Sequence, residues 1–263
     1  MISWRRVKSI LLEEYFISKR SLEIFFDIPF FAFTSLLLAG FIASFISSSI
    51  GIIGAQYLIL GMILWECLRI TQYSMSVSVL WEIWSRNLSN IFISPISIVE
   101  YFISLMISSI LKITIMSTML SLIAFFFFKF NILEVGLMNL ILILFNLVFF
   151  GWSTGIIILG LIFRFSTRVQ AIAWGIIFLF QPLTAALYPI SILPSAIQKV
   201  AFLFPPTYVF EAAREALRTS NLNWEYISTA FILNIVYLIG ALILFKYLFK
   251  SSKDMGQFAR NEG

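Results

Sequence analysis

The stretch VGLMNLILILFNLVFFGWSTGIIILGLIF, residues 135–163, contains no charged side chain and few polar ones. A helix needs roughly 20 consecutive apolar residues to cross the hydrocarbon core of a bilayer. Three further long stretches that are nearly all apolar, residues 28–46, 57–80 and 226–248, occur in the 263 residues. Because no soluble fold needs so many long apolar stretches, the sequence predicts an all-α polytopic membrane protein.

The composition of the chain agrees with this class. Hydrophobic residues make up 60% of the sequence and charged residues only 12%, whereas soluble domains carry about 25% charged residues. The one cysteine, Cys67, cannot form an internal disulfide, and histidine is absent. The absence of histidine removes the commonest general base and metal ligand.

The apolar stretches predict six transmembrane helices, at about residues 28–46, 56–79, 96–128, 135–163, 169–187 and 226–248. The third stretch would extend roughly 50 Å as one helix, so it should tilt or begin outside the bilayer. The expected organisation is an N-terminal segment (1–27), a six-helix domain (28–249) and a polar tail (250–263).

Residues 1–27 alternate charged and apolar side chains in a helical pattern. This pattern is typical of an amphipathic helix that lies in the plane of the membrane interface. The alternative is an ordinary cytoplasmic tail. A cleavable signal peptide is not expected, because its basic region would directly precede a short apolar core.

Six crossings place both termini on the same side, and the charge distribution predicts that this side is the cytoplasm. Twelve Lys and Arg residues then lie in the cytoplasm and four lie outside. The twelve are Arg5, Arg6, Lys8, Lys19, Arg20, Arg86, Arg164, Arg168, Lys246, Lys250, Lys253 and Arg260, and the four are Lys129, Lys199, Arg214 and Arg218. A multi-pass protein of the plasma membrane with cytoplasmic termini is expected.

Three charged residues fall inside the predicted spans. Glu66 and Arg69 are three residues apart near the middle of the second span, and Lys112 lies within the third. A charge at such depth costs at least about 2.5 kcal/mol unless it is paired or hydrated. Two interpretations remain open: a polar seam that lines a pathway or a subunit interface, and a structural Glu66–Arg69 ion pair with Lys112 nearby.

Residues 81–95, between the second and third spans, mix apolar and polar side chains at helical spacing. Glu82 and Arg86 are separated by one helical turn and could support an exposed helix. Such a helix could present Arg86, Leu88 and Ile91 to a soluble partner. The alternative is a helix that packs only on lipid.

The region between the last two spans, residues 189–225, contains two short apolar segments interrupted by prolines. Segments of this kind are typical of re-entrant or interfacial helices. After Pro205 and Pro206, acidic and basic residues alternate, with Glu211 and Arg214 three residues apart. One interpretation is a solvated charged stripe. The other is that Glu211 and Arg214 hold a re-entrant element near a channel exit.

Motifs for catalysis are absent from the sequence. It has no GxxxxGK[ST] loop for a nucleotide phosphate, no GxSxG or HExxH motif and no Cys/His cluster. We therefore expect no enzyme activity, no cofactor and no metal in this chain. The basic residues cluster beside apolar segments as topology signals, so no nucleic-acid partner is expected.

The order of these elements, together with several short motifs, resembles the permease subunit of the type-2 ATP-binding-cassette (ABC) exporter family along essentially the whole chain. The matching pieces are RNLSNIFISPIS at 86–97, Ala173-Trp174, Gln181-Pro182-Leu183, Tyr188-Pro189-Ile190, Leu193-Pro194, Pro205-Pro206-Thr207-Tyr208 and Glu211-Ala212-Ala213-Arg214.

The resemblance implies an export channel of two permease copies, identical or closely related, each binding one cytoplasmic ATPase subunit that holds the ATP. Residues 81–94 would be the coupling helix seated in the ATPase, and the basic turn with Arg164 and Arg168 a smaller contact. Residues 191–215 would form the outer gate.

The aromatic content suits an amphiphilic drug or a lipid-like substrate. A lipid-linked glycan is the alternative substrate. A non-transport membrane protein, either an enzyme or an assembly factor, is the alternative class.

Overall fold

The computed structural model describes residues 2–20 and 22–255, and helices make up nearly all of this part of the chain. The α-helices are α1 (Trp4–Arg20), α2 (Leu22–Trp84), α3 (Leu88–Ile93), α4 (Ile98–Phe128), α5 (Leu137–Phe165), α6 (Gln170–Leu183), α7 (Ser195–Ala201), α8 (Pro205–Thr219) and α9 (Trp224–Asp254). Three short 3-10 helices, η1 (Ile132–Val135), η2 (Ser166–Val169) and η3 (Ile190–Ile192), lie in the connections.

Five helical stretches within the described residues are long and apolar enough to cross a membrane, which confirms a multi-pass membrane protein. They are Phe26–Ser49, Gly51–Trp84, Ile98–Phe128, Leu137–Leu183 and Trp224–Asp254. Between the first two expected spans, 28–46 and 56–79, the chain turns at Gly51, whose φ is 75°.

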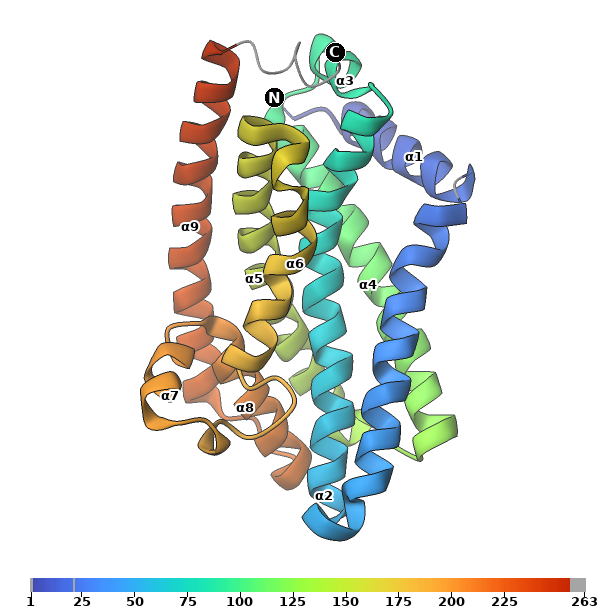
Figure 1. Cartoon of the computed structure of the whole chain (residues 1–263), viewed down its shortest axis with the longest axis vertical. Coiled ribbons are helices and arrows are strands. Elements are labelled where there is room, and N and C mark those ends of the chain that lie inside the picture. The colour runs from blue at the N-terminus through green and yellow to red at the C-terminus, as the bar shows by residue number, and fades with distance from the viewer. Residues whose placement is uncertain (1, 21, 256–263) are drawn as a thin grey trace.

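The stretch Leu137–Leu183 is not one straight helix. The chain reverses at Ser166 (φ 57°), where α5 ends, and α6 returns beside α5 (Figure 1). Helix α6 has 14 residues, fewer than the roughly 20 that a perpendicular crossing needs. Length and hydropathy therefore establish five candidate spans, and the sixth predicted crossing is not confirmed.

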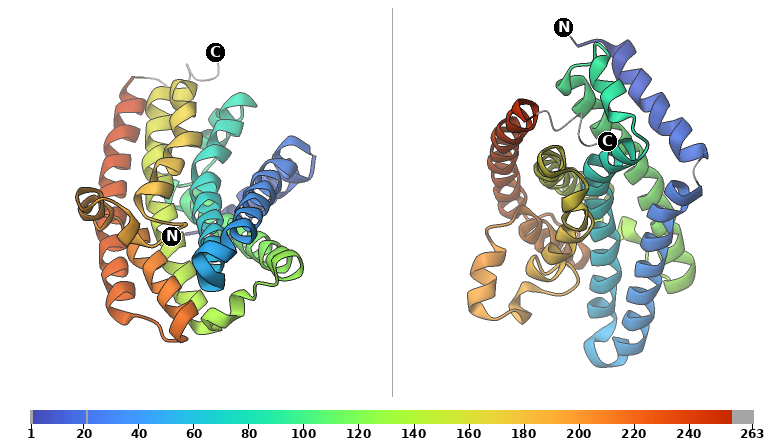
Figure 2. Two further views of the ribbon diagram at one scale, coloured as in Figure 1. Left: turned by 60° about the horizontal axis from the view of Figure 1, so that its bottom comes forward. Right: turned by 45° about the horizontal axis from the view of Figure 1, so that its top comes forward.

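The second half of α2 is the central helix of the bundle. Residues 59–77 are buried without interruption, as expected of a helix that is surrounded on all sides by other helices. Helix α2 as a whole packs against α4, α5, α6 and α8, and Figure 2 shows α5 and α6 between the second half of α2 and α9.

Glycines permit the close approach of α5 to the central helix. A Cβ atom on Gly151 would lie 2.6 Å from Thr71 Cβ, and one on Gly155 would lie 2.4 Å from Met75 Cβ. Small residues spaced four apart commonly let membrane helices approach closely, because association inside a bilayer depends on van der Waals contact.

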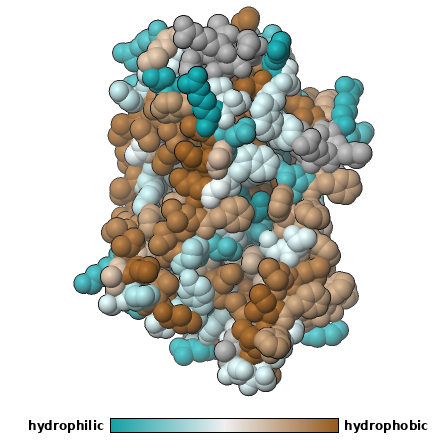
Figure 3. Space-filling model, viewed as in Figure 1, coloured by the Kyte–Doolittle hydropathy of each residue, from teal (hydrophilic) through white to brown (hydrophobic). Residues whose placement is uncertain are grey.

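The connections gather at two opposite ends of the bundle. Helices α1 and α3, the η2 turn and the end of α9 lie at one end, and the Gly51 turn, α7 and α8 lie at the other (Figure 1). Hydrophobic residues cover most of the middle of the face in Figure 3, and hydrophilic residues concentrate toward both ends. This separation is the one expected if the bundle axis crosses the bilayer.

Two expected boundaries are corrected. The N-terminal helix ends at Arg20 instead of residue 27, because α2 begins at Leu22. The segment 81–95 is not one helix: α2 continues to Trp84, and Arg86 adopts a left-handed conformation (φ 57°) before the six-residue α3.

Candidate functional site

The turn between α2 and α3 presents one basic side chain to solvent. Arg86 is exposed in its left-handed conformation, so it does not form the predicted helical pair with Glu82. Instead, the Asn87 side chain donates hydrogen bonds to Glu82 Oε2 (2.8 Å) and to Glu13 Oε1 of α1 (2.6 Å). The turn is therefore tied to the N-terminal helix.

The other residues predicted to contact a partner here point inward. Leu88, Ile91 and Glu82 are 1%, 6% and 6% exposed, and the two apolar side chains pack in a core cluster with Ile10 of α1 and Tyr101 of α4. A helix of six residues has one apolar face, and burial of that face against the bundle is favourable. Among the described side chains around this turn, Arg86, Asn90 and Ile93 are exposed.

Glu100, at the start of α4, bonds to residues at the beginning of α1. The Glu100 side chain is fully buried and accepts hydrogen bonds from the Ser3 amide (2.7 Å) and from the Ser97 amide (2.8 Å). Arg6 lies 3.5 Å from the same carboxylate. Sequence reasoning missed this residue, although Ser97-x-x-Glu100 after Pro95 matches a helix capping box.

Lys112 is not part of the charge group around Glu66. Its Nζ lies 3.4 Å from Glu14 Oε2 on α1, and Glu14 also accepts a hydrogen bond from Ser108. Lys112 therefore pairs with Glu14, and no ion pair among the described residues joins it to Glu66. Lys112 instead belongs to the contacts that hold α1 against α4.

Glu66 and Arg69 form a buried ion pair in the central helix. The Arg69 Nε–H donates to Glu66 Oε2 at 2.8 Å, and the second guanidinium nitrogen lies 2.7 Å from the same oxygen. The two residues are 1% and 6% exposed. Neither lines the hollow beside the start of α2 or the hollow between the Gly51 turn and the end of α4, so their burial favours the structural interpretation.

A second polar contact at membrane depth joins α9 to α5. The Asn234 side-chain amide donates to the Asn146 carbonyl oxygen (3.0 Å) and to Asn146 Oδ1 (3.1 Å), and both residues are buried. Sequence reasoning considered only charged residues and missed this pair. Asparagines that face each other in neighbouring spans are a recognisable signal for such contacts.

At the opposite end, Glu211 and Arg214 form an ion pair at 2.7 Å. Arg214 is only 4% exposed, and Glu211 also accepts a hydrogen bond from the Ile190 amide (2.6 Å). The solvated-stripe interpretation is therefore wrong for these two residues. Pro205 and Pro206 occupy the first turn of α8, where a missing N–H costs little.

The segment between α6 and α8 that Glu211 and Arg214 contact also bonds to the end of α6. The Tyr188 hydroxyl donates to the Pro182 carbonyl oxygen at 2.9 Å, and burial raises the pKa of this phenol. Arg214 Nη1 donates to the Ala186 carbonyl oxygen at 3.4 Å. Glu211, Arg214 and Tyr188 thus connect α8, the segment that follows α6 and the end of α6 through hydrogen bonds and one ion pair.

A model of the ABC-2 type transporter family matches residues 14–217, which extend from within α1 to near the end of α8. The chain belongs to the ABC-2 type transporter family. Comparison with curated proteins found no match. Membership identifies this chain as a membrane component of an ABC transporter and implies an ATPase subunit as its partner.

In this ABC-2 transporter the basic turn at η2 lies at the same end as Arg86 (Figure 1). Arg168 is exposed, and the Arg164 guanidinium lies 5.2 Å from the centre of the Phe165 ring. The turn therefore offers a basic surface separated in sequence from the α2–α3 turn.

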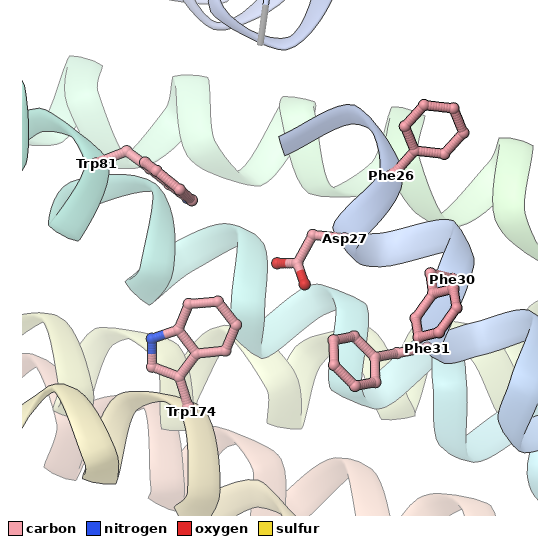
Figure 4. Close-up of a pocket in the computed structure, with 6 residues that line it drawn as sticks. All are labelled: Phe26, Asp27, Phe30, Phe31, Trp81 and Trp174. Carbon is pink, nitrogen blue, oxygen red and sulfur yellow. The ribbon is translucent and has the colours of Figure 1, made fainter. Parts of the chain in front are cut away.

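The transporter also has a hollow beside the start of α2 (Figure 4). It is lined by Phe26, Asp27, Phe30, Phe31, Trp81 and Trp174. The Tyr73 hydroxyl donates a hydrogen bond to Asp27 Oδ2. Among the described residues, no group of three His, Cys, Asp or Glu side chains is placed to hold a metal ion.

Proposed function

We propose that this chain is the permease subunit of an ABC exporter. It forms the transmembrane pathway for an amphiphilic or hydrophobic substrate, and a separate cytoplasmic ATPase drives transport. The observation that carries the proposal is the family match across α1 to α8. The connections between the helices lie at the two opposite ends of the bundle, which supports a membrane-spanning arrangement.

The proposed topology has six crossings in the plasma membrane, with α6 as the fifth and both termini in the cytoplasm. The charge distribution supports this orientation, because the α2–α3 turn with Arg86 and the α5–η2 turn with Arg164 and Arg168 lie at the end that carries α1. Helix α6 crosses together with the turn that follows it, residues 184–187.

Energy coupling is assigned to the surface around the α2–α3 turn. Arg86 and the exposed Ile93 would contact the ATPase, and Arg168 would make a second contact. Leu88 and Ile91 support this surface from inside, and Glu82 supports it through Asn87. A displacement of the α2–α3 turn would also displace α1, because the Asn87 side chain donates a hydrogen bond to Glu13 of α1.

Two basic residues provide a matched test of this coupling surface. Arg86 and Lys129 both adopt a left-handed conformation, with φ of 57° and 56°. The α2–α3 turn, which contains Arg86, and the end of α4, which Lys129 follows, lie at opposite ends of the bundle. Asparagine tolerates this conformation well. Arg86→Asn should therefore reduce co-purification of the ATPase and transport, whereas Lys129→Asn should leave both unchanged.

Equal co-purification of the ATPase with both variants would rule out Arg86 as a coupling contact. Failure of the unaltered chain to bind any ATPase subunit would instead favour a non-transport membrane protein.

The second permease copy and the substrate are parts of the same proposal. Two copies, identical or closely related, would enclose the pathway, and cross-linking in the membrane tests their pairing. A lipid-linked glycan is the second candidate substrate. A screen for compounds that stimulate ATPase activity of the reconstituted complex separates the two, because glycan carriers and small amphiphiles can be supplied individually.

A further inference from the structure

The hollow beside the start of α2 has the size and position of a ligand site. Its volume is about 370 Å³, within the range of small-molecule pockets. It lies where the first residues of α2, the last turn of α2 and the beginning of α6 meet. Its walls are therefore drawn from three segments that are distant in the sequence.

One carboxylate lies in this otherwise aromatic hollow. The Asp27 carboxyl group points into the space between the indole rings of Trp81 and Trp174 (Figure 4). None of the ion pairs formed by the described residues includes Asp27. A carboxylate at the edge of a membrane span is costly without a counter-charge, so a cation that entered the hollow would be stabilised there.

The aromatic side chains favour the same kind of ligand. Cations are attracted to the faces of aromatic rings, and tryptophan is the strongest partner. The Trp174 ring lies edge-to-face with Tyr73 at 5.5 Å. The Gln72 side chain donates to the neighbouring Ala173 carbonyl oxygen at 3.1 Å. Because the Tyr73 hydroxyl also donates to Asp27, one buried side chain contacts both the Trp174 indole and the carboxylate.

The hollow is open toward the surroundings of the bundle instead of its axis. Phe26 and Phe30 are 58% and 61% exposed, and both belong to a stretch apolar enough to lie in lipid. A ligand with an apolar body could therefore reach the hollow from the bilayer leaflet at the end that carries α1.

We propose that this hollow binds an amphiphilic organic cation, with its positive group against Asp27 and its apolar body against Phe30, Phe31 and the two tryptophans. The inference rests on the proposed permease function and deepens it by naming the substrate class. An anion would meet the Asp27 carboxylate, and a neutral lipid would leave the carboxylate without a counter-charge.

The test measures equilibrium binding of radiolabelled tetraphenylphosphonium to the purified chain in nanodiscs. Tetraphenylborate, which has the same shape and the opposite charge, serves as the matched probe. Asp27→Asn keeps an acceptor for Tyr73 and should weaken binding of the cation by at least about tenfold. Trp174→Leu should weaken it by about threefold.

Two control variants lie away from the hollow. Glu134→Gln removes an exposed carboxylate at the opposite end, and Phe45→Leu removes an 84% exposed aromatic ring from the first span. Both should bind the cation as the unaltered chain does. Equal binding by the Asp27→Asn variant and the unaltered chain, or stronger Asp27-dependent binding of the borate, would overturn the proposal.

The choice of nanodisc lipid tests whether the natural cation is a lipid headgroup or a soluble amphiphile. Phosphatidylcholine discs that weaken phosphonium binding relative to discs of digalactosyldiacylglycerol, which also has no net charge but carries no cationic group, would identify a lipid headgroup as the natural occupant. Equal binding in the two lipids would identify a soluble amphiphile that partitions into the leaflet. Either outcome retains an organic cation as the ligand.

Failure of this inference is separable from failure of the proposed function. Cross-linking from position 30 to a second copy, with no phosphonium binding, would assign the hollow to a subunit interface and overturn the ligand proposal. ATPase co-purification would be unaffected in that case. Loss of ATPase co-purification alone would overturn the permease assignment and leave the binding result standing.

Discussion

Replacement of Glu66 in the central helix tests whether its ion pair with Arg69 is structural. Glu66→Gln removes the charge that lies 2.7 Å from the guanidinium and leaves Arg69 buried at 6% exposure. Breaking a buried pair by removing one partner costs about 3–5 kcal/mol, whereas replacing both partners by apolar residues is often neutral. Glu66→Leu combined with Arg69→Leu should therefore be more stable than Glu66→Gln.

The expected size of the effect can be measured by heating the protein in detergent. One kcal/mol shifts Tm by about 2–4 °C in a chain of this size, so Glu66→Gln should lower Tm by about 6–20 °C. The chain carries its own reporter, because its one cysteine, Cys67, is 1% exposed in the same helix. A thiol-reactive dye reports the temperature at which Cys67 becomes accessible.

Two results would refute the reasoning. A Glu66→Gln variant with unchanged Tm would mean that the pair contributes nothing, and additive losses in the double variant would mean that the two residues are not coupled. Transport then separates the two interpretations of the pair. A double variant that is stable and exports normally supports a structural pair, whereas one that is stable and inactive supports a pathway-lining role.

Three further predictions concern topology, the outer layer and helix packing. On a cysteine-free background, cysteines at Ser48 and Ser220 should react with an impermeant reagent from outside, and labelling only from the cytoplasm would invert the topology. Glu211→Gln combined with Arg214→Gln should leave ATPase co-purification intact and reduce export, and normal export would exclude a gating role. Gly155→Leu should cost about 1–3 kcal/mol by overpacking, and an unchanged Tm would contradict the close contact of α5 with α2.

The membrane helices could be predicted because hydropathy is a local property. Residues 135–163 have no alternative to burial in lipid or protein, and Gly51 interrupts the first apolar pair at the expected place. The break in segment 81–95 was harder to predict from the sequence. The residues have helical spacing, but the left-handed Arg86 is followed by Asn87, whose side chain bonds Glu82 and Glu13, and Glu13 is distant in the sequence.

The charge partners required knowledge of the tertiary arrangement. Lys112 and Glu14 are 98 residues apart in the sequence, and nothing local indicates that α1 lies against α4. The Asp27 hollow is built from three segments in the same way. By contrast, the Glu66–Arg69 and Glu211–Arg214 pairs lie within single helical turns, so their spacing was informative.

The Gly51 turn also determines how much of the molecule an antibody could recognise from the end that carries α7 and α8. One glycine reverses the chain between two spans, and the residues after it, Ile52 and Ile53, are exposed but apolar. The exposed polar side chains that this hairpin offers among the described residues, Ser48 and Ser49, are small and carry no charge. A binder that depends on charged contacts at that end must therefore recognise residues 129–136 or 184–225, which makes the region of α7 and α8 its main target.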